Sequence, residues 1–182
     1  LNLYFHPVYI LKEKKFYNNR LNNGIKGKNE CKMKLCSACL LGIKCAWDGK
    51  DRKNEKVMAL LKKEILIPVC PEQLGGLPTP RPPQEIQGHS GEDVLDNKCR
   101  VINKEGSDVT EQFIRGAFEV LKIMRLLGVK EFIAKHESPA CGYGKIYDGT
   151  FTGKIINGDG VTTALLKRNG ITIIMEETFD SI

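Results

Sequence analysis

The sequence predicts an α/β fold in which helices cover both faces of a mainly parallel sheet. Short apolar segments typical of buried strands alternate along the chain with segments of helical period. Three of these strands lead into a cysteine and then a turn, at Cys39, Cys70 and Cys141. Alternating strands and helices favour a parallel sheet, and open α/β sheets hold their sites at the carboxyl ends of the strands. We therefore expect the three thiols to converge at that edge.

The first half of the chain supplies two buried strands with a helix between them. The strands are expected at 34–39 and 66–69, and the apolar spacing in 55–64 indicates one helical face. The segment after Cys70 reads PEQLGGLPTPRPPQEI and holds five prolines, so neither a helix nor a central strand is expected there. A long irregular loop at a strand end usually has a functional reason.

The second half adds a long amphipathic helix. It begins at the capping-box-like Asp108-x-x-Glu111 and ends at Gly128. The other elements are expected, in chain order, as a short strand at 99–103, a buried strand at 132–135, a glycine-rich loop at 141–160, a helix at 161–169 and a strand at 171–175.

The positive charge of the chain is concentrated at its N-terminal end. Residues 1–32 hold seven Lys/Arg and two Asp/Glu, whereas the other residues hold 21 and 20, within a formal net charge of +6. We expect 1–32 to be an extension outside the core and 33–182 to form one domain. The near-neutral remainder argues against a nucleic-acid-binding surface.

The cysteine content favours metal binding or catalysis in a reducing compartment. Seven cysteines are an odd number for a disulfide framework. No signal peptide is evident, and the apolar start LNLYFHPVYIL is too short to span a membrane. We expect a cytoplasmic protein without a membrane segment, in which clustered cysteines bind metal or react.

The three cysteines that follow strands could form a three-thiolate site. Thiolates suit iron–sulfur clusters, zinc and copper(I), and three protein ligands leave one coordination position for substrate. The alternative is that each cysteine is a small buried hydrophobic residue, and the spacing alone does not decide. Cys36 would face away from Cys39 on a strand and is expected in the core. Cys45 could be a spare ligand, and no role is expected for Cys31 and Cys99.

Five motifs resemble those of the thiouracil desulfidase family, also known as domain of unknown function 523. They are SACLLG, CAWDG, CPEQLGGLPTPRPP, SPACG and NGDGVTTALL, and the resemblance covers about 33–182. It implies a Rossmann-like three-layer domain with a 4Fe–4S cluster that converts thiouracil to uracil and sulfide without net redox change. It places the cluster ligands at Cys39, Cys70 and Cys141, and the catalytic carboxylate and hydroxyl at Glu72 and Ser138. The departures are Cys36 and the N-terminal extension.

The chemistry of these residues agrees with what the resemblance implies. An iron without a protein ligand is a Lewis acid, and the soft sulfur of a thiocarbonyl group suits it. Glu72, two residues from Cys70, could be a general base for water, and Ser138 could hydrogen-bond a substrate carbonyl or the water. Arg81 and His136 are candidates for substrate binding. Without the resemblance, Glu72 would be read as a solvated loop acid and Ser138 as a turn residue. The alternatives are a surface arginine for Arg81 and a hydrogen-bonded structural histidine for His136.

Three functions are therefore compared. The first is an iron–sulfur desulfidase acting on a small thiolated base, and the second is a non-catalytic zinc or iron–sulfur protein. The third is a module that acts on thiolated tRNA, with the basic extension as its anchor. Membership of a family does not by itself fix which thiolated base is used.

Overall fold

A four-stranded parallel sheet forms the centre of the structure, a computed structural model that describes residues 32–181. The strand order is β2-β1-β5-β8. The bounds of these strands are β1 Met33–Ser37, β2 Ile65–Val69, β5 Glu131–Ala134 and β8 Thr172–Met175. The register pairs Leu35 with Ile67 on one side and with Phe132 on the other. The carboxyl ends of three adjacent strands, β2, β1 and β5, therefore lie along one edge of the sheet.

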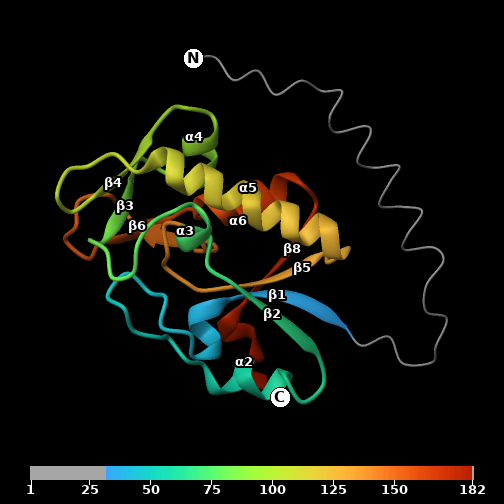
Figure 1. The fold of residues 1–182 in the computed structure, drawn as a ribbon. Coiled ribbons are helices and arrows are strands. Elements are labelled where there is room, and N and C mark those ends of the chain that lie inside the picture. The colour runs from blue at the N-terminus through green and yellow to red at the C-terminus, as the bar shows by residue number, and fades with distance from the viewer. Residues whose placement is uncertain (1–31, 182) are drawn as a thin grey trace, which may run out of the picture. The chain divides into compact units, whose positions relative to one another are not determined.

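Helices cover both faces of this sheet, as Figure 1 shows. The long helix α5 (Thr110–Leu127) and helix α6 (Val161–Arg168) lie on one face, and α2 (Glu55–Leu60) lies on the other. Successive residues of one strand enter different cores because side chains alternate across a strand. Leu35 and Phe132 pack into the larger core beneath α5, whereas Cys36 and Ile133 pack into the smaller core against α2. This arrangement confirms the predicted three-layer α/β fold.

Smaller elements connect the layers. They are the 3-10 helices η1 (Ala38–Leu41) and η2 (Glu176–Ser181), the short helices α3 (Pro71–Leu74) and α4 (Gly91–Leu95), and two antiparallel pairs. One pair joins β3 (Gln84–Gln87) to β4 (Arg100–Asn103), and the other joins β6 (Lys145–Tyr147) to β7 (Ile155–Asn157).

Three expectations from the sequence differ from the structure. The first strand ends at Ser37, and Cys39 lies in η1, where Gly42 in the left-handed region closes the turn. The proline-rich segment begins with the short helix α3, because Pro71 occupies a first-turn position where its missing N–H costs nothing. The glycine-rich loop contains the β6–β7 pair.

The sequence-based division of the chain applies only in part to the described residues. The extension expected at 1–32 lies outside them apart from Lys32. In the described part of the chain, no helix is long and apolar enough to cross a membrane.

Candidate active site

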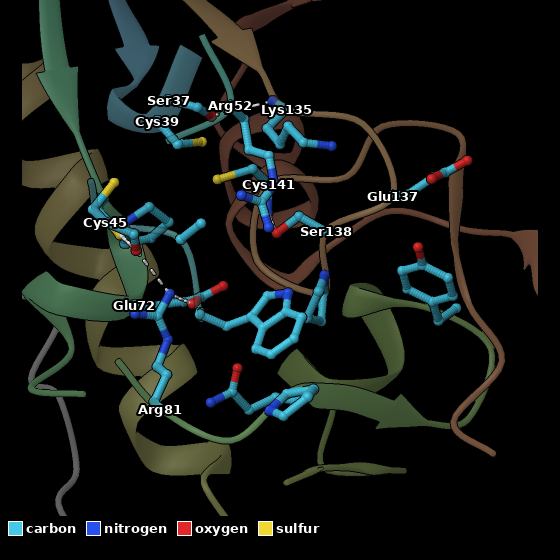
Figure 2. A pocket seen from close by; sticks show the side chains of 18 of the residues that line it. Ser37, Cys39, Cys45, Arg52, Glu72, Arg81, Lys135, Glu137, Ser138 and Cys141 are labelled. Atoms are coloured by element: carbon cyan, nitrogen blue, oxygen red, sulfur yellow. Dashed lines mark hydrogen bonds and ion pairs between the residues drawn. The ribbon is translucent and has the colours of Figure 1, made fainter. Parts of the chain in front are cut away.

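A cavity of about 480 Å³ opens at the carboxyl ends of β2, β1 and β5. Cys39, Cys70 and Cys141 all line it, together with Glu72 and Ser138. Figure 2 shows the labelled members of this group surrounding one space. The convergence expected from the sequence is therefore observed at the level of a shared cavity.

Each of the three cysteines reaches the cavity from a different strand end. Cys39 lies in η1 directly after β1, and Cys70 follows β2 as the N-cap residue of α3. Cys141 comes from the loop after β5 and is almost fully buried. Because β2, β1 and β5 are neighbours in the sheet, segments that are far apart in sequence meet at one edge.

Cys45 also lines the cavity, between Cys39 and Cys70. A hydrogen bond from the Cys45 thiol lowers the pKa of the Cys39 thiol, against the opposing effect of burial. The same thiol lowers the pKa of Cys70 to about 7, with help from the Gln73 backbone N–H and the Arg81 charge. The pKa values of two candidate ligands are therefore shifted toward the thiolate, the form that binds metal.

Ser138 shapes the loop that presents Cys141. Its Oγ accepts hydrogen bonds from the backbone N–H groups of Ala140, at 3.2 Å, and Cys141, at 3.1 Å. The Cys141 carbonyl accepts a hydrogen bond of 2.7 Å from Thr163 Oγ1 in α6. Burial raises the pKa of the Cys141 thiol, and a hydrogen bond with Ser37 acts in the opposite direction. The loop is therefore fixed on both sides of this cysteine.

Glu72 and Arg81 form a buried ion pair in the wall of the cavity. Glu72 is 8% exposed and Arg81 is 6% exposed. The guanidinium also donates from Nη2 to the Cys45 carbonyl at 3.1 Å, and from Nη1 to the Pro78 carbonyl and to Thr79 Oγ1. Most of the Arg81 donors are thus used within the protein, which favours a role in holding the site over a role as a free substrate clamp.

Positive side chains balance the negative charge that the thiolates would bring. Burial lowers the pKa of Arg81, while the charges of the four cavity cysteines act in the opposite direction, so the guanidinium lies within electrostatic reach of all four. Lys135 and Arg52 also line the cavity. Arg52 is held there by Asp48, whose carboxylate accepts a hydrogen bond of 3.0 Å from Nη2.

His136 lines the same cavity from the loop after β5. Its Nδ1 is paired with the buried carboxylate of Glu176, the first residue of η2. All seven candidate site residues named from the sequence therefore line the cavity. They are Cys39, Cys70, Glu72, Arg81, His136, Ser138 and Cys141. Lining the cavity does not by itself assign a role to any of them.

The sequence correctly predicted that Cys36 lies in the core. It left open whether Cys45 belongs to the site, and Cys45 lines the cavity. Cys36 is fully buried in the smaller core, and its thiol contacts the Ser37 carbonyl. Cys99 lies outside the cavity, and Cys31 is outside the described residues. Sequence reasoning did not single out three other residues that line the cavity, Arg52, Lys135 and Ser37. Arg52 follows the CAWDG motif closely, Ser37 lies two residues before Cys39, and Lys135 begins the loop that leads to Cys141.

The donor set fits an iron–sulfur cluster. The cavity combines three soft thiol ligands from separate segments with a buried cation within electrostatic reach, and the pKa is lowered at two of these thiols, Cys39 and Cys70. Within the described residues, no three His, Cys, Asp or Glu side chains gather closely enough for a single metal ion. A cubic cluster takes one thiolate at each of several irons, so its ligands need not meet at one point.

Comparison with known proteins places the chain among desulfidases. The family model described as 2-thiouracil desulfurase matches residues 35–178. A curated relative, the uncharacterized protein YbbK of Bacillus subtilis (strain 168), is 43% identical over 150 residues, which are 82% of this chain and 99% of YbbK.

A solved structure has the same fold. It is that of the [4Fe-4S]-dependent thiouracil desulfidase TudS, which matches with a TM-score of 0.71 and 39% sequence identity. The match covers 81% of this chain and 92% of TudS.

Proposed function

The chain belongs to the 2-thiouracil desulfurase family, and on this premise we propose that it is a 4Fe–4S-dependent desulfidase acting on a thiolated pyrimidine. The products are the oxo base and sulfide, with no net redox change. The observation that carries the proposal is that Cys39, Cys70 and Cys141 share one cavity with the buried carboxylate of Glu72. The [4Fe-4S]-dependent activity in the name of TudS supports it.

The three cysteines are the proposed cluster ligands. When bound there, the cluster would supply an iron without a protein ligand, a Lewis acid that suits the soft sulfur of a thiocarbonyl group. The pKa values of Cys39 and Cys70 are shifted toward the thiolate, and the Arg81 charge would offset part of the negative charge around the cluster. Cys45 is proposed to remain a thiol, because its hydrogen bonds to Cys39 and Cys70 raise its pKa.

Glu72 is the proposed general base. Its Oε2 contacts Arg81, so we assign Oε1 as the oxygen that takes a proton from the attacking water. Water then adds to the carbon that carries the sulfur. The ion pair keeps the carboxylate oriented toward the cavity, since the guanidinium is itself fixed by the Cys45 and Pro78 carbonyls.

Ser138 is the proposed hydrogen-bond donor to the substrate. A hydroxyl group has one O–H donor and two acceptor lone pairs. Both acceptor sites of Oγ are used by the N–H groups of Ala140 and Cys141. The O–H is therefore the part of the group that can act on a substrate, and it can donate to a pyrimidine carbonyl or to the attacking water.

The test is to purify the protein without oxygen and measure both colour and sulfide release. We expect a brown protein that releases sulfide from 2- or 4-thiouracil. Glu72→Gln should keep the colour and lose activity by about 10²–10⁴-fold, the usual contribution of general acid–base catalysis. Cys70→Ala should lose both, whereas Cys99→Ala, a half-buried cysteine outside the cavity, should lose neither.

Four results would redirect the proposal. A colourless protein with stoichiometric zinc would favour a structural metal site. A brown protein inert to thiolated bases and nucleosides would keep the cluster and exclude the substrate, and activity confined to thiolated tRNA would favour the third function. Full activity in Glu72→Gln would remove that residue from the mechanism.

A further inference from the structure

His136 and Glu176 form a pair at the cavity wall that the reaction above does not use. Nδ1 of the imidazole is paired with Glu176 Oε1. Glu176 is 4% exposed, and its other oxygen, Oε2, is buried and has no hydrogen-bond partner within the described residues. Burying a carboxylate costs free energy unless the group is paired or hydrogen-bonded, and here the pairing partner is His136.

The pairing determines which nitrogen of His136 can exchange a proton. A carboxylate accepts hydrogen bonds, so Nδ1 carries a hydrogen in both the neutral and the charged ring. Nε2 lies 3.7 Å from Glu137 Oε2, beyond the reach of a hydrogen bond. Nε2 is therefore the atom that can give up a proton and recover it, as the histidine of a proton shuttle does.

The other charged groups around the ring leave this assignment in place. Glu177 Oε1 lies 4.0 Å from Nδ1, on the side that Glu176 already occupies, and its side chain is exposed. Lys135 Nζ donates to the His136 carbonyl at 2.8 Å and so acts on the backbone rather than on the ring. Glu137, with a φ of 54°, holds a backbone conformation that is uncommon for a residue other than glycine, at the cavity wall.

The proposed reaction needs a second proton-transfer group besides Glu72. Water adds to the thiocarbonyl carbon and loses two protons by the time the new carbonyl has formed. The sulfur leaves with the electron pair of the broken C–S bond, so no oxidant or reductant is required. It must gain at least one proton to depart as hydrosulfide, while Glu72 holds a proton taken from the water.

We propose that His136, oriented by Glu176, is the general acid that delivers a proton from Nε2 to the departing sulfur. This inference rests on the proposed function. The imidazole then recovers its proton from solvent or from the second proton of the water. Glu72 lies in α3, after β2, whereas His136 follows β5, so the acid and the base reach the cavity from different elements. His136 is the catalytic residue and Glu176 its positioning residue.

The first test uses single-turnover kinetics of the cluster-loaded protein with 4-thiouracil, following the oxo base and sulfide separately. His136→Gln should still form the oxo base but release sulfide about 10²-fold more slowly. Added imidazole should restore part of that rate, which it would not do for a structural defect. Release at the unmodified rate in His136→Gln would overturn the inference. If the unmodified protein forms no oxo base, the proposed function itself fails.

The second test does not depend on the cluster or on activity. Nitrogen-15 spectra of the histidines, recorded on the full chain before cluster loading, report which ring nitrogen carries the proton. Only three histidines are present, and the His136→Gln spectrum identifies the signal. The neutral ring should be protonated at Nδ1. Glu176→Ala removes the acceptor and should lose this preference and slow sulfide release, whereas Glu177→Ala, at an exposed position, should do neither. An unchanged tautomer in Glu176→Ala would remove Glu176 from the pair.

Discussion

Arg81 connects three parts of the site through a single side chain. Its guanidinium contacts Glu72, the Cys45 carbonyl and the Pro78 carbonyl, and all of these lie in or beside the cavity wall. The planar guanidinium carries several donors and can bind all three groups at once, which the single ammonium group of a lysine could not do. Because the ion pair is buried, each partner depends on the other to avoid an uncompensated charge.

Removing this arginine should therefore destabilise the whole protein. Arg81→Ala leaves the Glu72 carboxylate buried without its cation, and breaking a buried pair in this way costs about 3–5 kcal/mol of the free energy of unfolding. Urea unfolding of the cluster-free protein would measure the loss. Arg100→Ala is the control, because Arg100 is exposed and its pair with Asp108 should contribute less than about 1 kcal/mol. Equal losses in the two variants would contradict this account.

Sequence reasoning predicted which residues share the cavity better than it predicted their contacts. The position of Cys39, Cys70 and Cys141 after strands was enough to predict a shared cavity. The engagement of Arg81 by Cys45 could not be predicted, because the two residues are 36 positions apart and lie in irregular loops. Periodicity gives no information about such loops, and only the folded backbone brings the Cys45 carbonyl to the guanidinium.

At the scale of secondary structure, the close packing of α3 against α5 sets the position of Cys70 and Glu72. A Cβ atom at Gly116 of α5 would lie 1.9 Å from the Pro71 carbonyl oxygen, and one at Gly75 would lie 2.0 Å from the Gln112 carbonyl oxygen. Both positions therefore need glycine for close approach of the two backbones. The proposed ligand and the proposed base thus depend on a contact made outside the cavity.

Gly116→Ala should disturb the site from a distance. In a helix, alanine is more favourable than glycine by about 1 kcal/mol. The added methyl group would overlap the Pro71 carbonyl, however, and such overpacking should cost about 1–3 kcal/mol of stability. To relieve the overlap, α3 must shift. We expect a lower urea midpoint and less iron bound per chain after cluster loading. Glu119→Ala, at a partly exposed position in the same helix, should change neither by much. Normal iron content together with normal stability in Gly116→Ala would contradict the proposed role of this contact.

The elements with strong apolar patterning were predicted from the sequence, and most of those in polar or glycine- and proline-rich stretches were not. The four sheet strands and the helices α2, α5 and α6 follow from apolar patterning and end signals such as Gly128. Of the remaining elements, β4 was expected as the strand at 99–103, whereas β3, β6, β7, α3 and α4 lie in polar or glycine- and proline-rich stretches and were not expected. Such elements are specified by tertiary packing, which local propensity does not reveal.

At the scale of the whole molecule, the proposed cluster would connect segments that the chain brings together only by folding. Its three ligands follow β1, β2 and β5, and they are separated in sequence by most of the described chain. A group that binds the folded protein and not the unfolded one stabilises the fold by mass action. The site that performs the chemistry should therefore also contribute to stability.

Loading the cluster should raise the thermal midpoint of unfolding. Binding at about 100 times the dissociation constant adds about 2.7 kcal/mol, which corresponds to roughly 5–10 °C for a chain of this size. Anaerobic calorimetry of loaded and chelator-treated protein would measure the difference. Cys141→Ala should abolish it, because one ligand is lost, whereas Glu72→Gln should retain it, because the carboxylate is assigned to the water and not to the metal. If Cys141→Ala gains as much from loading as the unmodified protein, the cluster is not held by this cysteine, and the three-ligand assignment is wrong.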